Sequence, residues 1–266
     1  MNRIIAKPCS VCETNMVKKF SARVLKKYEV NYFYCPMCGL LQTEEPYWLD
    51  EAYDTAISDA DTGLVARNIL ISRKLSRLLY FLFDKDGRYL DVGGGYGLLT
   101  RLMRDIGFDF YWTDKYCDNL LARGFESNKA SPTFSAIMAF EVLEHLHDPL
   151  SFIKDSLSDS GTKTIIFSSE LYEGVPPRPD EWWYYVFNTG QHISFYQKKT
   201  LRYIADNMRL HFHTNGGIHM LTDKTVNSFV YKILTGTGRF SNVLSHIVGR
   251  NMKSKTFSDH EKLMQT

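Results

Sequence analysis

Hydrophobic residues recur with two different spacings along the chain, and these spacings outline its elements. Between residues 64 and 82 they recur every three or four positions, which predicts a long helix. Short apolar runs predict four strands, at 88–92, 108–113, 134–139 and 164–168. Helical spacing returns after the first strand and again after Asp148, which we expect to cap a helix with Pro149 in its first turn. This alternation predicts an α/β fold with a doubly wound, Rossmann-like sheet.

The sheet is expected to end in an antiparallel hairpin. Apolar runs at 210–213 and 218–221 flank Asn215-Gly216, a dipeptide typical of tight turns. From these patterns we divide the chain into a zinc-binding module at 1–45, a connecting helical segment at 46–86, a Rossmann-like domain at 87–222 and a C-terminal helical extension at 223–266. The extension is basic and partly amphipathic, so it could rest on a membrane surface. The alternative is a helix packed on the domain that frays after Asn251.

Composition narrows the class of protein. The chain has 266 residues, 44% of them apolar, and its 32 Lys and Arg against 30 Asp and Glu give a net charge of +2. This balance lacks the strong positive field of proteins held by phosphates, so nucleic acid is disfavoured as a partner. The chain shows neither a secretory signal nor an apolar run long enough to span a bilayer. We therefore expect a cytoplasmic protein, of undetermined oligomeric state.

Four of the five cysteines form two C-x2-C pairs, which predict a structural zinc site. The pairs are Cys9 with Cys12 and Cys35 with Cys38. Two thiolates from each pair can fill the corners of one tetrahedron, which leaves no open position for catalysis. The alternative is four unligated buried thiols. Cys117 stands apart and is expected to be a spectator.

A glycine-rich turn follows the strand at 88–92 and leads into a helix, an arrangement typical of a cofactor loop. Its candidate binding residues are Asp91, Gly93, Gly94, Gly95 and Gly97. Such a turn brings backbone amides close to a ligand. The next strand ends in Asp114, which could accept both ribose hydroxyls of an adenosine. The D-x-G-x-G-x-G pattern fits G-x-G-x-x-G poorly, so we favour a sulfonium cofactor over a pyrophosphate.

These motifs resemble the class I S-adenosylmethionine-dependent methyltransferases. The resemblance rests on the cofactor loop, Asp114 and the string from Glu141 to Pro149, EVLEHLHDP. The cysteine pairs, Glu51-Ala52-Tyr53 and the late QHISFY at 191–196 are similar, more narrowly, to zinc-containing methyltransferases of sugar and surface-polysaccharide biosynthesis, including sugar C-methyltransferases.

The resemblance implies a seven-stranded sheet, S-adenosylmethionine as cofactor and a zinc module beside the active site. It implies that Asp91 and the glycines hold the methionine end, that Asp114 binds the ribose, and that Phe140 and Glu141 lie under the methyl group. Sugar C-methyltransferases often have Glu before the late histidine, whereas this chain has Gln191. We therefore expect O-methylation in preference to C-methylation.

Two histidines are candidates for the base that would deprotonate the acceptor, because imidazole titrates near neutral pH. His192 is the first, since it follows an aromatic loop on the side where open α/β sheets bind ligands. His145 is the second, one turn beyond Glu141. Either could instead only hold a loop or a ligand in place. Candidate contacts with the acceptor are Tyr53, Glu170, Trp183, Tyr184 and Tyr196.

Three functions follow from these observations. The first is methyl transfer to a small, sugar-linked acceptor. The second is RNA methylation, in which basic residues of the cysteine module would contact RNA: Lys7, Lys18, Lys19, Arg23, Lys26 and Lys27. The third is a cofactor-binding scaffold without turnover.

Overall fold

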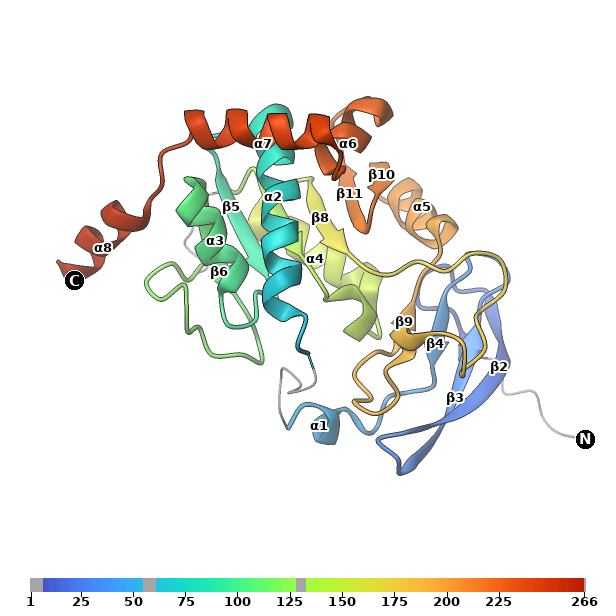
Figure 1. The fold of residues 1–266 in the computed structure, drawn as a ribbon. Helices are drawn as coiled ribbons and strands as arrows, with labels where there is room; N and C mark the ends of the chain where they lie inside the picture. Colours follow the sequence, from blue (N-terminus) through green and yellow to red (C-terminus); the bar gives the residue numbers. More distant parts are fainter. Residues whose placement is uncertain (1–6, 55–60, 128–132, 266) are drawn as a thin grey trace, which may run out of the picture.

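The computed structural model describes residues 7–54, 61–127 and 133–265, which form two sheets (Figure 1). The larger sheet has the order β10-β11-β8-β7-β5-β6. Its strands are β5 (Arg88–Val92), β6 (Asp109–Thr113), β7 (Ala136–Ala139), β8 (Ile165–Ser168), β10 (His211–Asn215) and β11 (Ile218–Thr222). β5 to β8 are parallel, and β11 and β10 add an antiparallel edge, as predicted.

The expected count of seven strands is not met within the described ranges, where this sheet has six. Next to β6 the chain makes a single parallel bridge between Trp112 and Glu126. The backbone of Trp112 accepts from Ser127 and donates to Phe125, at 2.8 Å in both cases. The free edge of β6 is therefore covered by a short stretch of chain in place of a strand.

Helices cover both faces of this sheet, and its parallel strands are therefore buried on both sides. The helices are α1 (Leu49–Ala52), α2 (Leu64–Leu82), α3 (Leu98–Ile106), α4 (Pro149–Ser160), α5 (Lys198–Asn207), α6 (Ser228–Thr235), α7 (Arg239–Asn251) and α8 (Thr256–Met264). One apolar core joins α2, α3, α6 and α7 to one face, with Tyr89 among its strand residues. Leu90, the next residue, joins a second core with α4 and α5 on the other face. Asp148 caps α4 as predicted, accepting from the Ser151 amide at 2.9 Å.

The smaller sheet combines the N-terminal segment with a late one, in the order β1-β2-β3-β4-β9. Its strands are β1 (Lys7–Pro8), β2 (Asn15–Val24), β3 (Tyr28–Tyr34), β4 (Leu41–Thr43) and β9 (Ser194–Phe195). Through β9 this sheet extends across the predicted boundary at residue 45 and takes in a late segment of the chain. The four-part division stays a prediction. Two short 3-10 helices, η1 (Leu143–His145) and η2 (Trp183–Tyr185), lie beside it.

The C-terminal extension packs on the domain beyond Asn251, so the expectation of fraying there was wrong. The carboxylate of Asp259 in α8 lies 2.7 Å from two nitrogens of Arg104 in α3, and both side chains are buried. A buried guanidinium and carboxylate in two-pronged contact fix α8 beside α3. Among the described residues, no helix is long and apolar enough to cross a membrane.

Candidate active site at the carboxyl edge of the sheet

The glycine loop joins β5 to α3 and leaves room only for glycine. Gly93, Gly95 and Gly97 have φ angles of 71°, 53° and 84°, in the left-handed region that other residues rarely adopt. A Cβ atom on Gly94 would lie 2.7 Å from the Trp112 ring. The loop's own amides are engaged within the chain, since those of Gly93 and Gly94 donate to the Thr113 carbonyl, and the turn brings bare backbone close to the start of α3.

Asp114 lies directly beside this loop because β5 and β6 are paired in parallel up to their carboxyl ends. Because Val92 pairs with Thr113, the chain leaves both strands at the same edge of the sheet. One oxygen of the Asp114 carboxylate accepts from the Gly95 amide at 2.9 Å. The other accepts from the amides of Tyr116 and Cys117, at 2.7 and 2.9 Å. The predicted loop and acidic residue are thus brought together.

Asp91 is buried at the end of β5, with only 2% of its surface exposed. The Thr100 hydroxyl donates to its carboxylate at 3.2 Å. Burial raises the pKa of Asp91 to about 7, since a carboxylate loses its hydration there. A positively charged group close to the loop would compensate this carboxylate.

The small sheet sets the position of the late histidine. β4 pairs with β9, and the amide of Ile193 donates to the Glu144 carbonyl in η1 at 2.8 Å. The side chain of Gln42 in β4 also donates to the Ser194 hydroxyl and to the His147 carbonyl, at 2.9 and 2.8 Å. β9 is therefore fixed between β4 and η1, and His192 comes next to His145.

The two candidate bases meet at the carboxyl edge of the sheet. The rings of His145 and His192 are perpendicular, with centroids 4.9 Å apart. Nδ1 of His192 lies 2.8 Å from the Tyr184 carbonyl, which can only accept, so Nδ1 carries the proton and Nε2 keeps its lone pair. Burial lowers the pKa of His145 to about 3 and that of His192 to about 4. Both imidazoles are thus neutral at pH 7.

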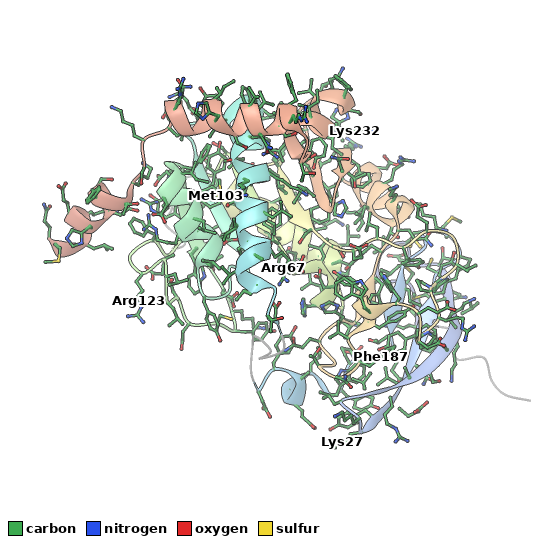
Figure 2. All side chains as sticks on the ribbon, in the orientation of Figure 1. Lys27, Arg67, Met103, Arg123, Phe187 and Lys232 are labelled. Atoms are coloured by element: carbon green, nitrogen blue, oxygen red, sulfur yellow. The ribbon has the colours of Figure 1, made fainter. Side chains whose placement is uncertain are left out.

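Two carboxylates lie beside the histidines. Glu144 is fully buried, and neither of its side-chain oxygens has a hydrogen-bond partner among the described residues. Its pKa is raised to about 8 by burial, with a contribution from Glu141. Glu141 accepts from the Ser168 hydroxyl at 2.5 Å and lies 3.4 Å from Nε of Arg67. Figure 2 shows Arg67 at the lower end of α2, the end that faces this edge.

Arg67, Glu144 and Ser168 were not predicted as site residues. Arg67 belongs to a helix whose spacing indicated only core packing, and its contact with Glu141 crosses from α2 to the loop after β7. Glu144 directly precedes His145 in the EVLEHLHDP string. A carboxylate next to a candidate base could have indicated a site residue.

Of the predicted acceptor contacts, Tyr53 and Tyr184 lie against the histidines, whereas Trp183 and Glu170 are exposed. Tyr53 lies in the site, with its hydroxyl 2.9 Å from Nδ1 of His145 and its ring stacked on Tyr116 at 5.1 Å. Tyr184 is buried with its ring 4.6 Å from that of His192, while Trp183 is 74% exposed. Glu170 is exposed directly after β8.

Tyr196 does not fit its predicted role. It is fully buried, and its hydroxyl donates to the Leu143 carbonyl at 2.6 Å. The core surrounds the ring of Tyr196, and its hydroxyl is engaged by the Leu143 carbonyl. Tyr196 is therefore a core residue and does not belong to the candidate site. Gln191 occupies the position at which sugar C-methyltransferases often have Glu. Its side chain donates to the Ala52 carbonyl at 2.8 Å and so fixes the backbone next to Tyr53.

The four cysteines of the two pairs converge at one point. The Sγ atoms of Cys9 and Cys38 lie 3.5 Å apart, and those of Cys12 and Cys35 lie 3.4 Å apart. A tetrahedral zinc ion with bonds of about 2.3 Å would separate its sulfurs by about 3.8 Å. The amides of Val11 and Cys38 point at two of the sulfurs, both at 3.5 Å. The four thiols therefore fit a four-coordinate metal.

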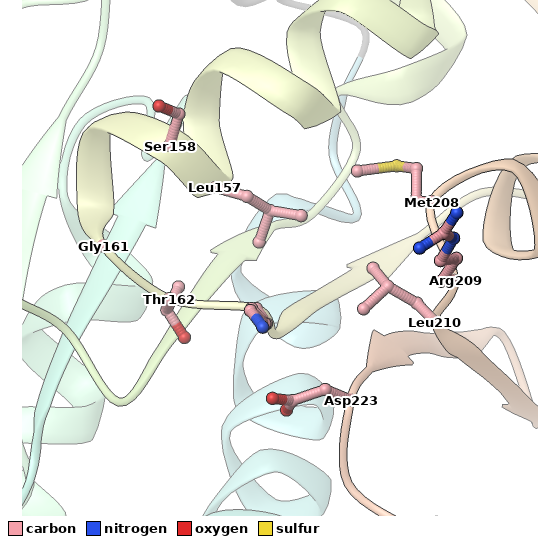
Figure 3. A pocket seen from close by; sticks show the side chains of 9 residues that line it. Leu157, Ser158, Gly161, Thr162, Met208, Arg209, Leu210 and Asp223 are labelled. Carbon is pink, nitrogen blue, oxygen red and sulfur yellow. The ribbon is translucent and has the colours of Figure 1, made fainter.

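A surface hollow of about 490 Å³ lies elsewhere, at the amino end of β8 (Figure 3). Its lining includes Leu157 and Thr162 on one side and Met208, Leu210 and Asp223 on the other. Parallel sheets of this kind bind ligands at the carboxyl ends of their strands. The hollow is on the opposite edge from the glycine loop, so we do not place the acceptor there.

A family model described as a methyltransferase domain matches residues 66–208, which contain the glycine loop, Asp114 and both histidines. The chain belongs to this family. The expected enzyme class, a methyltransferase, is thereby confirmed.

Solved structures of methyltransferases are distantly similar to this chain. The plantazolicin methyltransferase BpumL with SAH is 11% identical (TM-score 0.48), covering 76% of this chain and 90% of that one. CalO1, a methyltransferase of calicheamicin biosynthesis with SAH bound, is 12% identical (TM-score 0.47), covering 68% and 60%. Human N-acetylserotonin methyltransferase with SAM is 11% identical (TM-score 0.43), covering 67% and 66%. The chain spans about 60% of the length of the first structures it matches. No curated protein matches it.

Proposed function

We propose that the methyltransferase transfers a methyl group from S-adenosylmethionine to a hydroxyl of a small acceptor. The observation that carries this proposal is the contact between the Gly95 amide and Asp114, 2.9 Å long. It places an acidic side chain directly beside the glycine loop at the start of α3. The structures of CalO1 with SAH and of the human enzyme with SAM support the same cofactor.

The residues around the glycine loop fit the cofactor. S-adenosylmethionine supplies an electrophilic methyl group on a positively charged sulfur. Asp114 would accept from the ribose hydroxyls. Asp91 and the glycine loop would hold the charged methionine end, which suits a buried carboxylate whose pKa is raised. Phe140 and Glu141, directly after β7, would lie under the methyl group.

His192 is the residue we propose to act on the acceptor, with His145 beside it. Its unprotonated Nε2 is available because Nδ1 is held by the Tyr184 carbonyl. Methyl transfer to oxygen is an in-line displacement, so most of the barrier reduction comes from holding the acceptor close to the methyl group. A base at the acceptor hydroxyl adds about 10²- to 10⁴-fold.

The acceptor is proposed to be a sugar or a nucleotide-linked sugar of a surface polysaccharide pathway. Tyr53, Tyr184, Trp183 and Glu170 would contact it, as aromatic rings and a carboxylate suit a polyhydroxylated ring. O-methylation is favoured over C-methylation because Gln191 is a neutral amide engaged with the Ala52 carbonyl. The four cysteines are proposed to hold a structural zinc ion, and the protein is proposed to work in the cytoplasm.

RNA methylation is the second candidate, favoured by one observation. Lys18, Lys19, Arg23 and Lys26 are all exposed on β2 and the turn after it. Figure 2 shows Lys27 at the tip of the same hairpin, where it lies 2.8 Å from Glu51. Binding to an RNA that weakens steeply with salt would support this function.

The proposed function is tested by a mass-spectrometric screen. The purified protein is incubated with S-adenosylmethionine and a panel of nucleotide sugars, and products heavier by one methylene are sought. A product whose formation depends on Asp114 supports the proposal. Modification of RNA but of none of the sugars would transfer the assignment to the second candidate.

A further inference from the structure

Glu144 has a buried carboxyl group that the proposed methyl transfer does not use. Its main-chain carbonyl accepts from Ile193, but both side-chain oxygens are buried without a hydrogen bond among the described residues. The Tyr184 hydroxyl is close but outside hydrogen-bonding geometry. An unpartnered buried polar group costs about 1–3 kcal/mol, and more when it is charged. A proton or a bound cation would compensate this group.

Two imidazoles stand beside this carboxyl group. One ligand atom each from Glu144, His145 and His192 lie within 4.8 Å of one another. A tetrahedral ion with bonds of about 2.1 Å separates its ligands by about 3.4 Å, so binding would draw these atoms closer together. His145, whose Nδ1 lies 2.9 Å from the Tyr53 hydroxyl and whose ring also bonds to the Gln191 backbone, would exchange one of these contacts for the ion. His192 already has the second contact typical of a metal ligand, because its Nδ1 donates to a backbone carbonyl at 2.8 Å.

The charges around the site favour a cation. Glu141 and Glu144 approach it from the segment after β7, and Arg67 approaches from α2. Arg67 is held by both oxygens of Asp61, at 2.8 and 3.2 Å, so its charge is already matched. Three carboxylates against one guanidinium leave an excess of two negative charges when Glu144 is ionised.

We propose that Glu144, His145 and His192 bind a divalent transition-metal ion at the acceptor end of the candidate site. Two imidazole nitrogens and one carboxylate oxygen suit ions such as Zn²⁺ and Co²⁺ better than Mg²⁺, which prefers oxygen ligands. Three protein ligands leave a coordination position open, unlike the four-cysteine site. The chain would then hold two metal ions of different kinds.

The open position gives the ion a role that rests on the proposed function. An acceptor hydroxyl bound there becomes more acidic and releases its proton to solvent water. Its oxygen then forms a bond to the methyl carbon, while the electron pair of the carbon–sulfur bond stays on sulfur. The products are a methyl ether and S-adenosylhomocysteine. With the ion bound, Nε2 of His192 is a metal ligand, so the ion activates the acceptor hydroxyl; His192 acts as the base only in the metal-free protein. The acceptor class is therefore one that presents a hydroxyl, not an acidic carbon.

The test uses Co²⁺ as the probe, because thiolate and imidazole sites give different spectra. The metal-free full chain is titrated with Co²⁺ without cofactor, and bound metal is counted. The wild type is expected to bind two ions, one with a thiolate charge-transfer band and one with weak ligand-field bands only. Glu144→Gln and His192→Ala should each weaken the second ion at least tenfold and keep the thiolate band, which also reports that the variant is folded. The double variant Cys35→Ser, Cys38→Ser should lose the thiolate band and keep the second ion.

The control is Glu173→Gln, which removes an exposed carboxylate paired with Lys198 and should leave both ions in place. A wild type that binds a single ion with the thiolate band overturns the proposal, and so does a second ion indifferent to both variants. Cofactor binding is measured separately, by calorimetry on the same protein. A chain that binds S-adenosylmethionine but only one Co²⁺ contradicts the metal site and leaves the proposed function standing.

Discussion

The rings of His145 and His192 meet edge to face, with their centroids 4.9 Å apart. One imidazole belongs to η1 after β7, and the other precedes β9 in the small sheet. Their contact therefore depends on the pairing of β4 with β9, which joins the cysteine-containing sheet to the methyltransferase domain. This contact makes the N-terminal segment part of the candidate active site.

Replacing His192 with Ala should abolish most of the turnover and spare cofactor binding. We expect kcat for the true acceptor to fall by about 10²- to 10⁴-fold, because the group that activates the acceptor is lost. The Kd for S-adenosylmethionine should change less than about twofold, since His192 lies at the acceptor end. His211→Ala, an exposed residue of β10, is the control and should retain full activity. Unchanged turnover in His192→Ala would remove this residue from the mechanism.

Asp114→Ala should weaken binding of S-adenosylmethionine. Loss of hydrogen bonds from a charged acceptor to the ribose costs about 1.5–3 kcal/mol, which corresponds to roughly a 10- to 100-fold higher Kd. The matched control is Asp118→Ala, an exposed carboxylate four residues further on. Isothermal titration of both variants provides the measurement. Equal affinities for the two would contradict the assignment of the ribose site.

Asp91 should make the free protein less stable as pH rises. Its pKa is about 7 when folded, above the usual value near 3.8, so the folded state binds more protons in this interval. The corresponding stability is complete below about pH 4 and lost as pH rises through about 7, up to about 4 kcal/mol. Asp91→Asn should remove this dependence and melt higher than the wild type at pH 8. Thermal unfolding between pH 5 and 8 shows the difference, and parallel curves for both proteins would refute it.

The four-cysteine site should contribute to the stability of the fold. Cys35→Ser should lower the zinc content and destabilise the protein by at least about 2 kcal/mol, a fall in melting temperature of about 4–8 °C. Cys117→Ser is the matched control, because that thiol lies apart from the cluster. Melting curves with and without a chelator give the answer. A wild type that melts at the same temperature after metal removal would show that the thiols hold no structural ion.

The main elements could be predicted because their signals are local. The strand at 88–92 and the helix at 64–82 have the predicted bounds, since an apolar run and a helical spacing are properties of neighbouring residues. The hairpin around Asn215-Gly216 was equally visible. The glycine loop and Asp114 could be paired because parallel strands end at one edge of a sheet.

Other features depend on contacts between distant residues, which the patterns do not contain. Asp259 and Arg104 are 155 residues apart, so the docking of α8 left no trace in the spacing of apolar residues. Tyr196 lies four residues after His192, a candidate base, and its aromatic ring suggested an acceptor contact. Its hydroxyl instead binds the Leu143 carbonyl in the core. Arg67 was missed for the same reason, because its contact with Glu141 joins residues 74 positions apart.

Calorimetric titration of the purified full chain with S-adenosylmethionine tests whether this protein binds the proposed cofactor. We expect saturable binding at one site per chain, which Asp114→Ala weakens at least tenfold. Absence of binding at millimolar cofactor by a folded protein would contradict it.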